Sequence, residues 1–153
     1  MSEVELVDTT LREGQQHGAV SFSSEQALAL AKRLDYFGVT FIEVGHPVIS
    51  EQDRTTATLL CDSGLQAQTL AHARACIADI RAAHSVGAQW VGIFAGINEV
   101  SLRYKMKRSR EAVLTAVEEA VYEAKSLGMK VRFTCEDASR TSLELVETLF
   151  DCA

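Results

Sequence analysis

The stretch Asp8–Gln16, which reads DTTLREGQQ, gathers an aspartate, two threonines, an arginine, a glutamate and two glutamines. It follows an apolar run that includes Val4, Leu6 and Val7. A solvated loop would account for this composition, because connections between elements are usually polar. Carboxylates and a guanidinium at the end of a strand can also hold a metal ion or stabilise an oxyanion. The stretch is therefore a candidate site as well as a candidate loop.

Other polar side chains follow the later apolar runs of the chain. They lie at Glu43 to His46, His72, Asn98, and Thr134 to Arg140. Because side chains alternate along a strand, Arg132 and Thr134 should point to the same face of theirs. The carboxyl ends of parallel strands meet at one edge of a sheet, and barrel enzymes carry out their chemistry there. We therefore expect these groups to gather at one place.

Composition narrows the possible classes of protein. The 153 residues, 47% of them hydrophobic, suffice for one domain with its own core. A net charge of −6 argues against a nucleic-acid partner, which requires a basic face. No leader pattern or membrane span is evident, so we expect a cytoplasmic protein without membrane contact. None of the four cysteines forms a CxxC pair, and only Cys135 lies among polar residues.

Five short strand patterns alternate with helical patterns along the chain. The expected strands span residues 4–7, 39–44, 66–71, 90–94 and 131–133. The expected helices begin near Ser23, Ser50, Arg74, Ser109 and Ser142, and they end near Gly38, Gly64, Gly87, Gly128 and Phe150. Such alternation predicts right-handed β-α-β units and a parallel sheet. No linker interrupts the pattern, so residues 1–153 form a single expected domain.

The α/β class leaves two architectures open. Five β/α units are rather more than half of a TIM (β/α)8 barrel, which needs eight strands and typically ~250 residues. An open doubly wound sheet is the alternative, since it can be built from five parallel strands. No GxGxxG follows the first strand and no P-loop occurs, so a nucleotide has no evident phosphate cradle. We therefore expect the N-terminal five strands and helices of a TIM barrel, incomplete in this chain.

The sequence resembles one family of metal-dependent barrels. DTTLREGQQ is similar to the first-strand motif of the homocitrate synthase, isopropylmalate synthase and hydroxymethylglutaryl-CoA lyase family, departing from it at Gln15, where an acid is common. Three later segments are also similar, in the same order: IEVGHP at 42–47, TLAHAR at 69–74 and VRFTCEDASR at 131–140. Glu13, CEDASR and LRYKMKRSRE at 102–111 look most like homocitrate synthases, including the form associated with nitrogenase.

The resemblance implies an acyltransferase with a divalent metal ion, Mg, Mn or Zn, and acetyl-CoA as co-substrate. Acetyl-CoA would be deprotonated at its methyl group, its enolate would attack a metal-held 2-oxo acid, and the thioester would be hydrolysed. An isopropylmalate- or citramalate-type synthase or an aldol-type lyase is the alternative activity. A non-catalytic half-barrel, or a subunit of a split enzyme that binds a 2-oxo acid, is the alternative of another class.

The first-strand motif carries two implied roles. Glu13 matches the family's first-strand metal ligand, and Arg12 matches a catalytic residue that also contacts substrate, beside the oxyanion. Neighbouring residues of an extended segment point to opposite sides, so both can reach one site only if the loop bends. We expect Gly14 to permit that bend.

Three further polar residues match family positions. Gln16 matches a contact to the 2-oxo acid, and Glu43 matches a catalytic position that orients the arginine or the substrate. His72 matches a contact to the substrate carboxylate. Taken without the family, Glu43 would be read as a salt-bridge partner and His72 as a hydrogen-bonded structural histidine.

Arg132 and Thr134 give an expectation for the substrate. A guanidinium and a hydroxyl on one strand face could grip a distal carboxylate together, which would favour 2-oxoglutarate over a branched monocarboxylate. The nearby Glu136, Asp137 and Arg140 could belong to the site or form a helix-capping charge cluster.

The family's H-x-H metal motif does not occur in this sequence, whose histidines stand at 17, 46, 72 and 84. One protein carboxylate would hold a divalent ion only weakly. Three explanations remain open: a fragment of a longer enzyme, one chain of a split enzyme, or a half-barrel that dimerises. We accordingly expect a homo-oligomer or a complementing chain that carries an H-x-H site.

Overall fold

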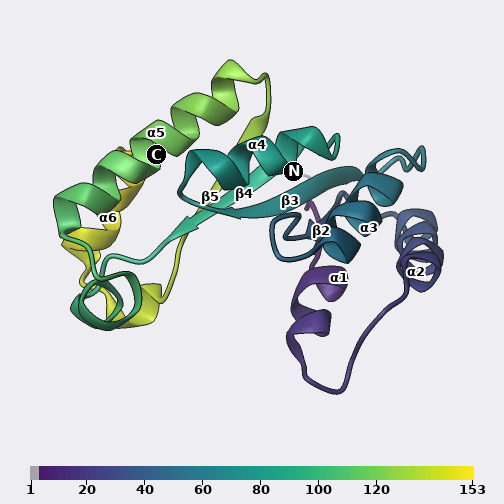
Figure 1. Ribbon diagram of the computed structural model, residues 1–153, viewed down its shortest axis with the longest axis horizontal. Coiled ribbons are helices and arrows are strands. Elements are labelled where there is room, and N and C mark those ends of the chain that lie inside the picture. Colours follow the sequence, from purple (N-terminus) through teal and green to yellow (C-terminus); the bar gives the residue numbers. More distant parts are fainter. Residues whose placement is uncertain (1–3) are drawn as a thin grey trace.

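The computed structural model describes residues 4–153 and shows a five-stranded parallel sheet with the order β1-β2-β3-β4-β5 (Figure 1). Its strands are β1 (Val7–Asp8), β2 (Phe41–Gly45), β3 (Gln68–Arg74), β4 (Trp90–Ala95) and β5 (Lys130–Cys135). Its α-helices are α1 (Thr10–Glu13), α2 (Ser24–Phe37), α3 (Glu51–Cys61), α4 (Ile77–Ser85), α5 (Arg110–Ser126) and α6 (Leu143–Asp151). Short turns of other helix types are η1 (Gly14–Gln16), η2 (Ser101–Met106) and η3 (Ala138–Arg140).

Four of the five expected helices begin within one residue of the predicted position, but α4 begins at Ile77, because Arg74, where the sequence predicts its start, is the last residue of β3. Ser23 and Gln26 form a capping box at the start of α2, in which each side chain pairs with the backbone of the other. Ser50 and Ser109 accept hydrogen bonds from the backbone at the starts of α3 and α5. Within residues 4–153, no helix has both the length and the apolar character needed to cross a lipid bilayer.

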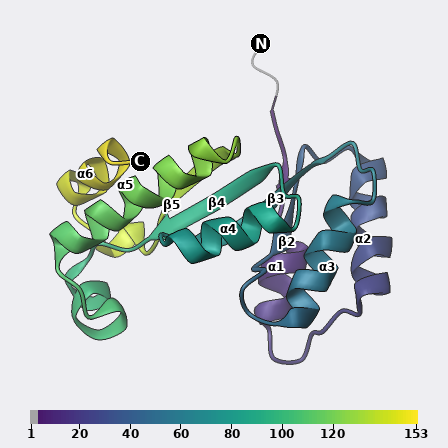
Figure 2. The same ribbon diagram turned by 45° about the horizontal axis from the view of Figure 1, so that its top comes forward.

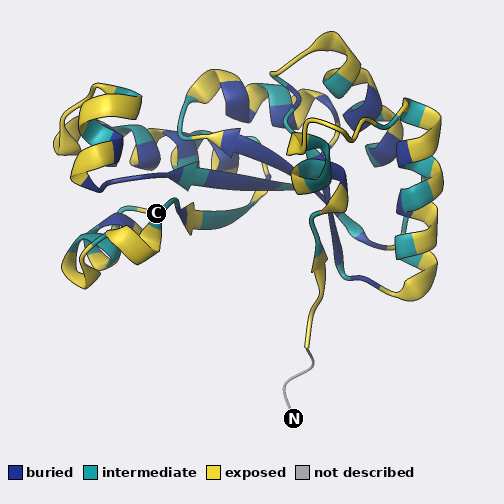
Figure 3. Ribbon diagram, turned by 90° about the horizontal axis from the view of Figure 1, so that it is seen from below, coloured by how far each residue is buried: buried dark blue, intermediate teal, exposed yellow. Residues whose placement is uncertain are grey.

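The two faces of the sheet differ in chemistry. Helices α3, α4 and α5 pack on one face, as Figure 2 shows. The strand side chains of the apolar core point toward these helices: Ile42, Val44, Ala71, Ala73, Val91 and Ile93. The alternate residues, among them Glu43, His72, Gly92 and Arg132, point to the opposite face. Figure 3 shows the central strands buried and the outer sides of the helices exposed.

This arrangement excludes the doubly wound alternative for the described residues. Each strand lies beside its neighbours in sequence, so the order has no switch point. A barrel likewise places its helices outside and its alternate strand residues inside. The helix-free face of the sheet, which we call the inner face, therefore corresponds to the interior of a barrel.

The DTTLREGQQ stretch is not the expected loop. It forms α1 and η1, and Gly14 has ordinary right-handed helical angles, so the expected bend at Gly14 is wrong. Asp8 starts this helix by accepting hydrogen bonds from the backbone nitrogen and the hydroxyl of Thr10, at 2.9 and 3.1 Å. In a helix, consecutive side chains diverge by only about 100°, so Arg12 and Glu13 can reach one site.

Two other expectations also differ from the structure. The first strand is short, because only Val7 and Asp8 pair with β2, and Val4 is 82% exposed instead of buried. A π-helical turn at η2 lies in a region for which the sequence predicts no element. Its irregular hydrogen bonding has no simple periodic signature.

Candidate functional site

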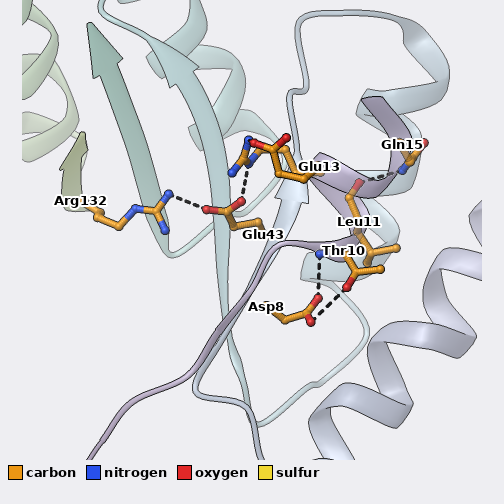
Figure 4. A network of polar contacts seen from close by, with 8 residues as sticks. Asp8, Thr10, Leu11, Glu13, Gln15, Glu43 and Arg132 are labelled. Carbon is orange, nitrogen blue, oxygen red and sulfur yellow. Dashed lines mark hydrogen bonds and ion pairs between the residues drawn. The ribbon is translucent and has the colours of Figure 1, made fainter. Parts of the chain in front are cut away.

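A completely buried carboxylate, Glu43 of β2, lies on the inner face. It accepts hydrogen bonds from two arginines: Arg12 Nε of α1, and Arg132 Nη2 of β5 at 2.5 Å. Figure 4 shows Arg132 reaching Glu43 across the sheet. A buried charge is tolerated when it is paired and hydrogen-bonded, and here each carboxylate oxygen has its own guanidinium partner.

Arg12 is held by two carboxylates. Besides Glu43, it donates through Nη1 to Glu13, whose side chain is 55% exposed. Burial by itself would lower the pKa of Arg12, but the hydrogen bonds and negative charges of Glu43 and Glu13 outweigh it and raise that pKa. Arg12 is therefore a fixed positive charge at the carboxyl ends of the strands.

Helix α1 is held in place by its packing against the apolar core, and this packing sets the direction of the Arg12 side chain. Leu11 is buried in the apolar core, and its carbonyl oxygen accepts a hydrogen bond from Gln15 Nε2 at 2.9 Å (Figure 4). With Leu11 inward and Asp8 at the helix start, rotation of α1 would expose apolar surface. The guanidinium is thus positioned by packing before any ligand binds.

Two histidines and a phenylalanine form an aromatic cluster beside the arginines. His72 of β3 stacks on Phe94 of β4 with ring centroids 4.8 Å apart, and His46 meets the His72 ring edge-on at 4.9 Å. Burial lowers the pKa of His72 to about 3, and the positive charges of Arg12 and Arg132 add to this effect. Burial, with the charge of Arg12, also lowers the pKa of His46. Both imidazoles are therefore neutral at physiological pH.

The turn after β2 brings His46 into this cluster. A register irregularity between Glu43 and Gly45 interrupts the pairing of β2 with β3. Gly45 has φ +98°, a left-handed conformation that favours glycine. The chain is redirected there, and His46 faces His72 instead of continuing the strand.

These groups surround a cavity of about 260 Å³, which we call the arginine cavity. Its lining comprises Arg12, Glu13, Gln16, His46, His72, Phe94, Arg132, Thr134 and Glu136. All the side chains predicted to bind substrate are therefore brought together, and Glu13 joins them. Glu43 is not in the lining but pairs with two arginines that are. Its ion pairs agree with the salt-bridge interpretation, which is compatible with an orienting role.

The charged residues after β5, Glu136, Asp137 and Arg140, do not all belong to the cavity. Glu136 lines the arginine cavity and pairs with Lys105 Nζ at 2.6 Å. Asp137 instead pairs with Arg140 at 2.8 Å and accepts a hydrogen bond from Asn98 at 2.9 Å. Asp137 therefore links the loop after β5 to the loop after β4, and neither Asp137 nor Arg140 lines this cavity.

The sequence interpretation gave no role in the site to two members of the cavity. Phe94 was assigned only to a strand, and His46 was given no role, although its place after a strand end was a usable signal. Cys135 is buried in an apolar cluster with α5 and α6, and it does not line the arginine cavity. Its position on the strand alternates with those of Arg132 and Thr134, which explains the opposite direction.

The donors present do not make a metal site by themselves. Within residues 4–153, no group of three or more histidine, cysteine or acidic side chains is placed to hold a metal ion. Glu13 is a single carboxylate that pairs with Arg12. Hard divalent cations require about six oxygen ligands. Glu13 as a metal ligand therefore stays a prediction that needs donors beyond those described.

A family model described as HMGL-like matches residues 3–153. The chain belongs to the HMGL-like family. A homocitrate synthase from Pyrococcus abyssi is 43% identical to this HMGL-like chain over 136 residues, which are 89% of the chain and 38% of that protein. Homocitrate synthase AksA from Methanopyrus kandleri is 40% identical over 151 residues, 99% of the chain and 38% of that protein. The chain thus spans about two-fifths of the length of these relatives.

A solved structure confirms the architecture of the HMGL-like chain. The HMG-CoA lyase from Brucella melitensis has a TM-score of 0.79 at 16% identity, covering 100% of this chain and 59% of that chain. At this identity the comparison establishes the fold alone. The expected N-terminal part of a TIM barrel is therefore confirmed, and the family model and the relatives confirm the resemblance.

Proposed function

We propose that this chain supplies the acid-binding part of an acyltransferase that condenses acetyl-CoA with a 2-oxo acid, with 2-oxoglutarate as the favoured acid and homocitrate as the product. The observation that carries the proposal is the arginine cavity, where Arg12 and Arg132 converge through Glu43 at the carboxyl ends of the strands. Its support is the similarity to proteins named homocitrate synthase along most of the chain.

The cavity offers two groups of donors for a dicarboxylate. Arg132 and Thr134 lie on one face of β5, and Arg12 and Gln16 come from α1 and η1. A 2-oxo acid with a second carboxylate could contact both groups, whereas a branched monocarboxylate would leave one of them without an anionic partner. We therefore assign Arg132 and Thr134 to the distal carboxylate.

Arg12 would act on the reacting end of the acid. Attack of an acetyl-CoA enolate on a ketone places negative charge on the ketone oxygen, and a fixed guanidinium favours that charged state over the neutral ketone. Glu43 would keep Arg12 in place without touching the acid. Neutral His72 can donate or accept a hydrogen bond without adding charge to the cavity.

Glu13 remains our proposed metal ligand, and the ion could be Mg, Mn or Zn. A bound divalent ion would polarise the ketone oxygen. The remaining ligands would have to come from a longer form of the chain, from a complementing chain that carries an H-x-H motif, or from a second copy in a homo-oligomer.

The proposal is tested on the protein purified from its own host, in whatever length or assembly it has there. Release of free CoA from acetyl-CoA is followed with 2-oxoglutarate, 2-oxoisovalerate or pyruvate, with and without EDTA, and the product is identified by mass. We expect fastest release with 2-oxoglutarate, a product of homocitrate mass, and loss of release with EDTA. Binding of 2-oxoglutarate without any CoA release would overturn the catalytic proposal and favour a binding role.

A further inference from the structure

Gly92 of β4 occupies the middle of the inner face, between two residues of the arginine cavity. In the register of the sheet, it lies beside His72 of β3 on one side and Arg132 of β5 on the other. Its neighbours in sequence, Val91 and Ile93, point into the apolar core on the helix side. A side chain at position 92 would therefore point into the inner face.

The backbone does not explain a glycine here. Gly92 lies outside the left-handed region of φ, so any residue could adopt its conformation. Glycine inside a strand weakens that strand, because it has no side chain to pack and gains more freedom on unfolding. A glycine in a strand interior often marks a close approach by another group.

Three side chains make that close approach. A Cβ atom at position 92 would lie 2.9 Å from Leu70 Cδ2, 3.0 Å from His72 Nδ1 and 3.4 Å from Arg132 Nη2. The first two distances are too short for carbon, so the neighbours would have to move. The space above Gly92 is therefore already filled by its neighbours.

The third atom connects Gly92 to the site. Arg132 Nη2 is the same nitrogen that donates to Glu43 Oε1 at 2.5 Å. Arg132 belongs to β5 and Glu43 to β2, so two strands separate them. The guanidinium reaches Glu43 by crossing β4 at the one position of that strand that has no side chain.

We propose that Gly92 is a positioning residue that holds open the path of Arg132 across the sheet and thereby sets how the cavity selects a dicarboxylate. The selection part rests on the function proposed above. Among the residues that the structure describes, Glu43 provides the only hydrogen bond to the Arg132 guanidinium, and Arg132 Nε has no partner. No other hydrogen bond would oppose displacement of Arg132 by a methyl group at position 92.

The test is a double-mutant cycle on the protein purified as it exists in its host. Dissociation constants for 2-oxoglutarate are measured by calorimetry for the unaltered protein, Gly92→Ala, Arg132→Ala and the double variant. We expect Gly92→Ala to weaken binding about tenfold, the effect of losing a charge-assisted hydrogen bond. In the Arg132→Ala background the same change should weaken binding by less than about twofold, because the two residues act as a unit. Equal factors in both backgrounds would overturn the inference.

Two further variants separate positioning from packing. Gly18→Ala is the matched control, since a Cβ atom there meets nothing within 4 Å, and binding should be unchanged. Leu70→Ala combined with Gly92→Ala removes the closest contact of the new methyl group but keeps the one with Arg132. The weaker binding should persist in that protein, and its full recovery would show that Gly92 serves packing alone.

If the proposed function is wrong, the outcome can be told apart from a failure of the positioning role. If the unaltered protein binds no 2-oxoglutarate, that function is contradicted, and the cycle is measured by thermal unfolding instead. Arg132→Ala should then lower the melting temperature less in the Gly92→Ala protein than in the unaltered protein, because Gly92→Ala already disturbs the ion pair between Arg132 and Glu43. An unreduced loss would overturn the positioning role.

Discussion

At the scale of single residues, the site is organised around buried polar groups and their charged neighbours. Glu43 is buried between two arginines, and His72 is buried among positive charges. Each group depends on its neighbours, because an unpaired buried charge is costly. The free energy of unfolding should therefore depend on the state of these groups even when no ligand is bound.

We predict that His72 makes folding sensitive to mild acid. Its pKa is about 3 in the folded protein, against about 6.5 in an unfolded chain, so between these values the unfolded state binds the extra proton. The stabilising contribution of neutral His72 is complete above pH 6.5 and is lost progressively as the pH falls. Between pH 7 and 5 this loss should amount to about 2 kcal/mol.

Denaturant unfolding at both pH values checks this prediction. His72→Gln, which does not titrate, should lose about 2 kcal/mol less than the unaltered protein over that interval. His46 also has a lowered pKa and remains in both proteins, so its contribution cancels in the comparison. Identical pH dependence of the two proteins would contradict the assignment of His72 as a buried neutral imidazole.

Residue types and spacing predicted most members of the arginine cavity. Arg132 and Thr134 were placed on one face because side chains alternate along a strand, and both line the cavity. Phe94 could not be predicted, because the sequence does not show whether an apolar residue of a strand will point to the helices or to the inner face. The importance of Gly92 likewise depends on side chains from two other strands, which meet only in the folded sheet.

At the scale of elements, most helix starts were predictable, whereas the start of α4 and the structure of the first polar stretch were not. Ser23 caps α2 through a local pattern of side chain and backbone contacts that the sequence contains in full. DTTLREGQQ forms a helix of four residues followed by η1, too short to show an amphipathic period. Such a helix depends on Asp8 at its start and on the burial of Leu11.

The first turn of α4 is tied to the end of β3 by a contact that depends on charge. Asp79 is 2% exposed and accepts hydrogen bonds from the backbone and guanidinium of Arg74 and from Cys76 Sγ. Burial by itself would raise the pKa of Asp79, but these hydrogen bonds and the charge of Arg74 outweigh it and lower that pKa. The stabilising contribution of Asp79 is therefore present above about pH 4 and lost as the pH falls further.

We predict that Asp79→Ala destabilises the protein by about 2 kcal/mol at pH 7, since several hydrogen bonds to one charged group are lost. The difference should shrink at pH 3, because there the unfolded chain binds a proton at Asp79 that the folded protein holds less readily. Urea unfolding at the two pH values measures both effects. Glu51→Ala, an 82% exposed acid at the start of α3, is the matched control and should stay within about 0.5 kcal/mol. An Asp79→Ala protein as stable as this control would contradict the role of Asp79 in joining α4 to the end of β3.

At the scale of the whole molecule, five β/α units present a polar inner face and bury an apolar outer one. Alternation of strand and helix patterns predicted this architecture, and the sequential strand order bears it out. The arginine cavity lies on the inner face and draws side chains from β3, β4, β5, α1 and η1. The chain spans about two-fifths of its curated relatives, and the donors described do not form a metal site. The proposed catalysis is therefore to be tested on the protein as it is purified from its host.

The central claim is that this face grips a 2-oxo dicarboxylate through Arg132. The most direct test is calorimetric binding of 2-oxoglutarate and 2-oxoisovalerate to the host-purified protein and its Arg132→Ala variant. Arg81→Ala, a 67% exposed arginine paired with Glu123 on the helix side, is the matched control. We predict that Arg132→Ala weakens 2-oxoglutarate binding at least about tenfold and 2-oxoisovalerate binding less than about threefold. Equal weakening of both acids, or of neither, would contradict the assignment.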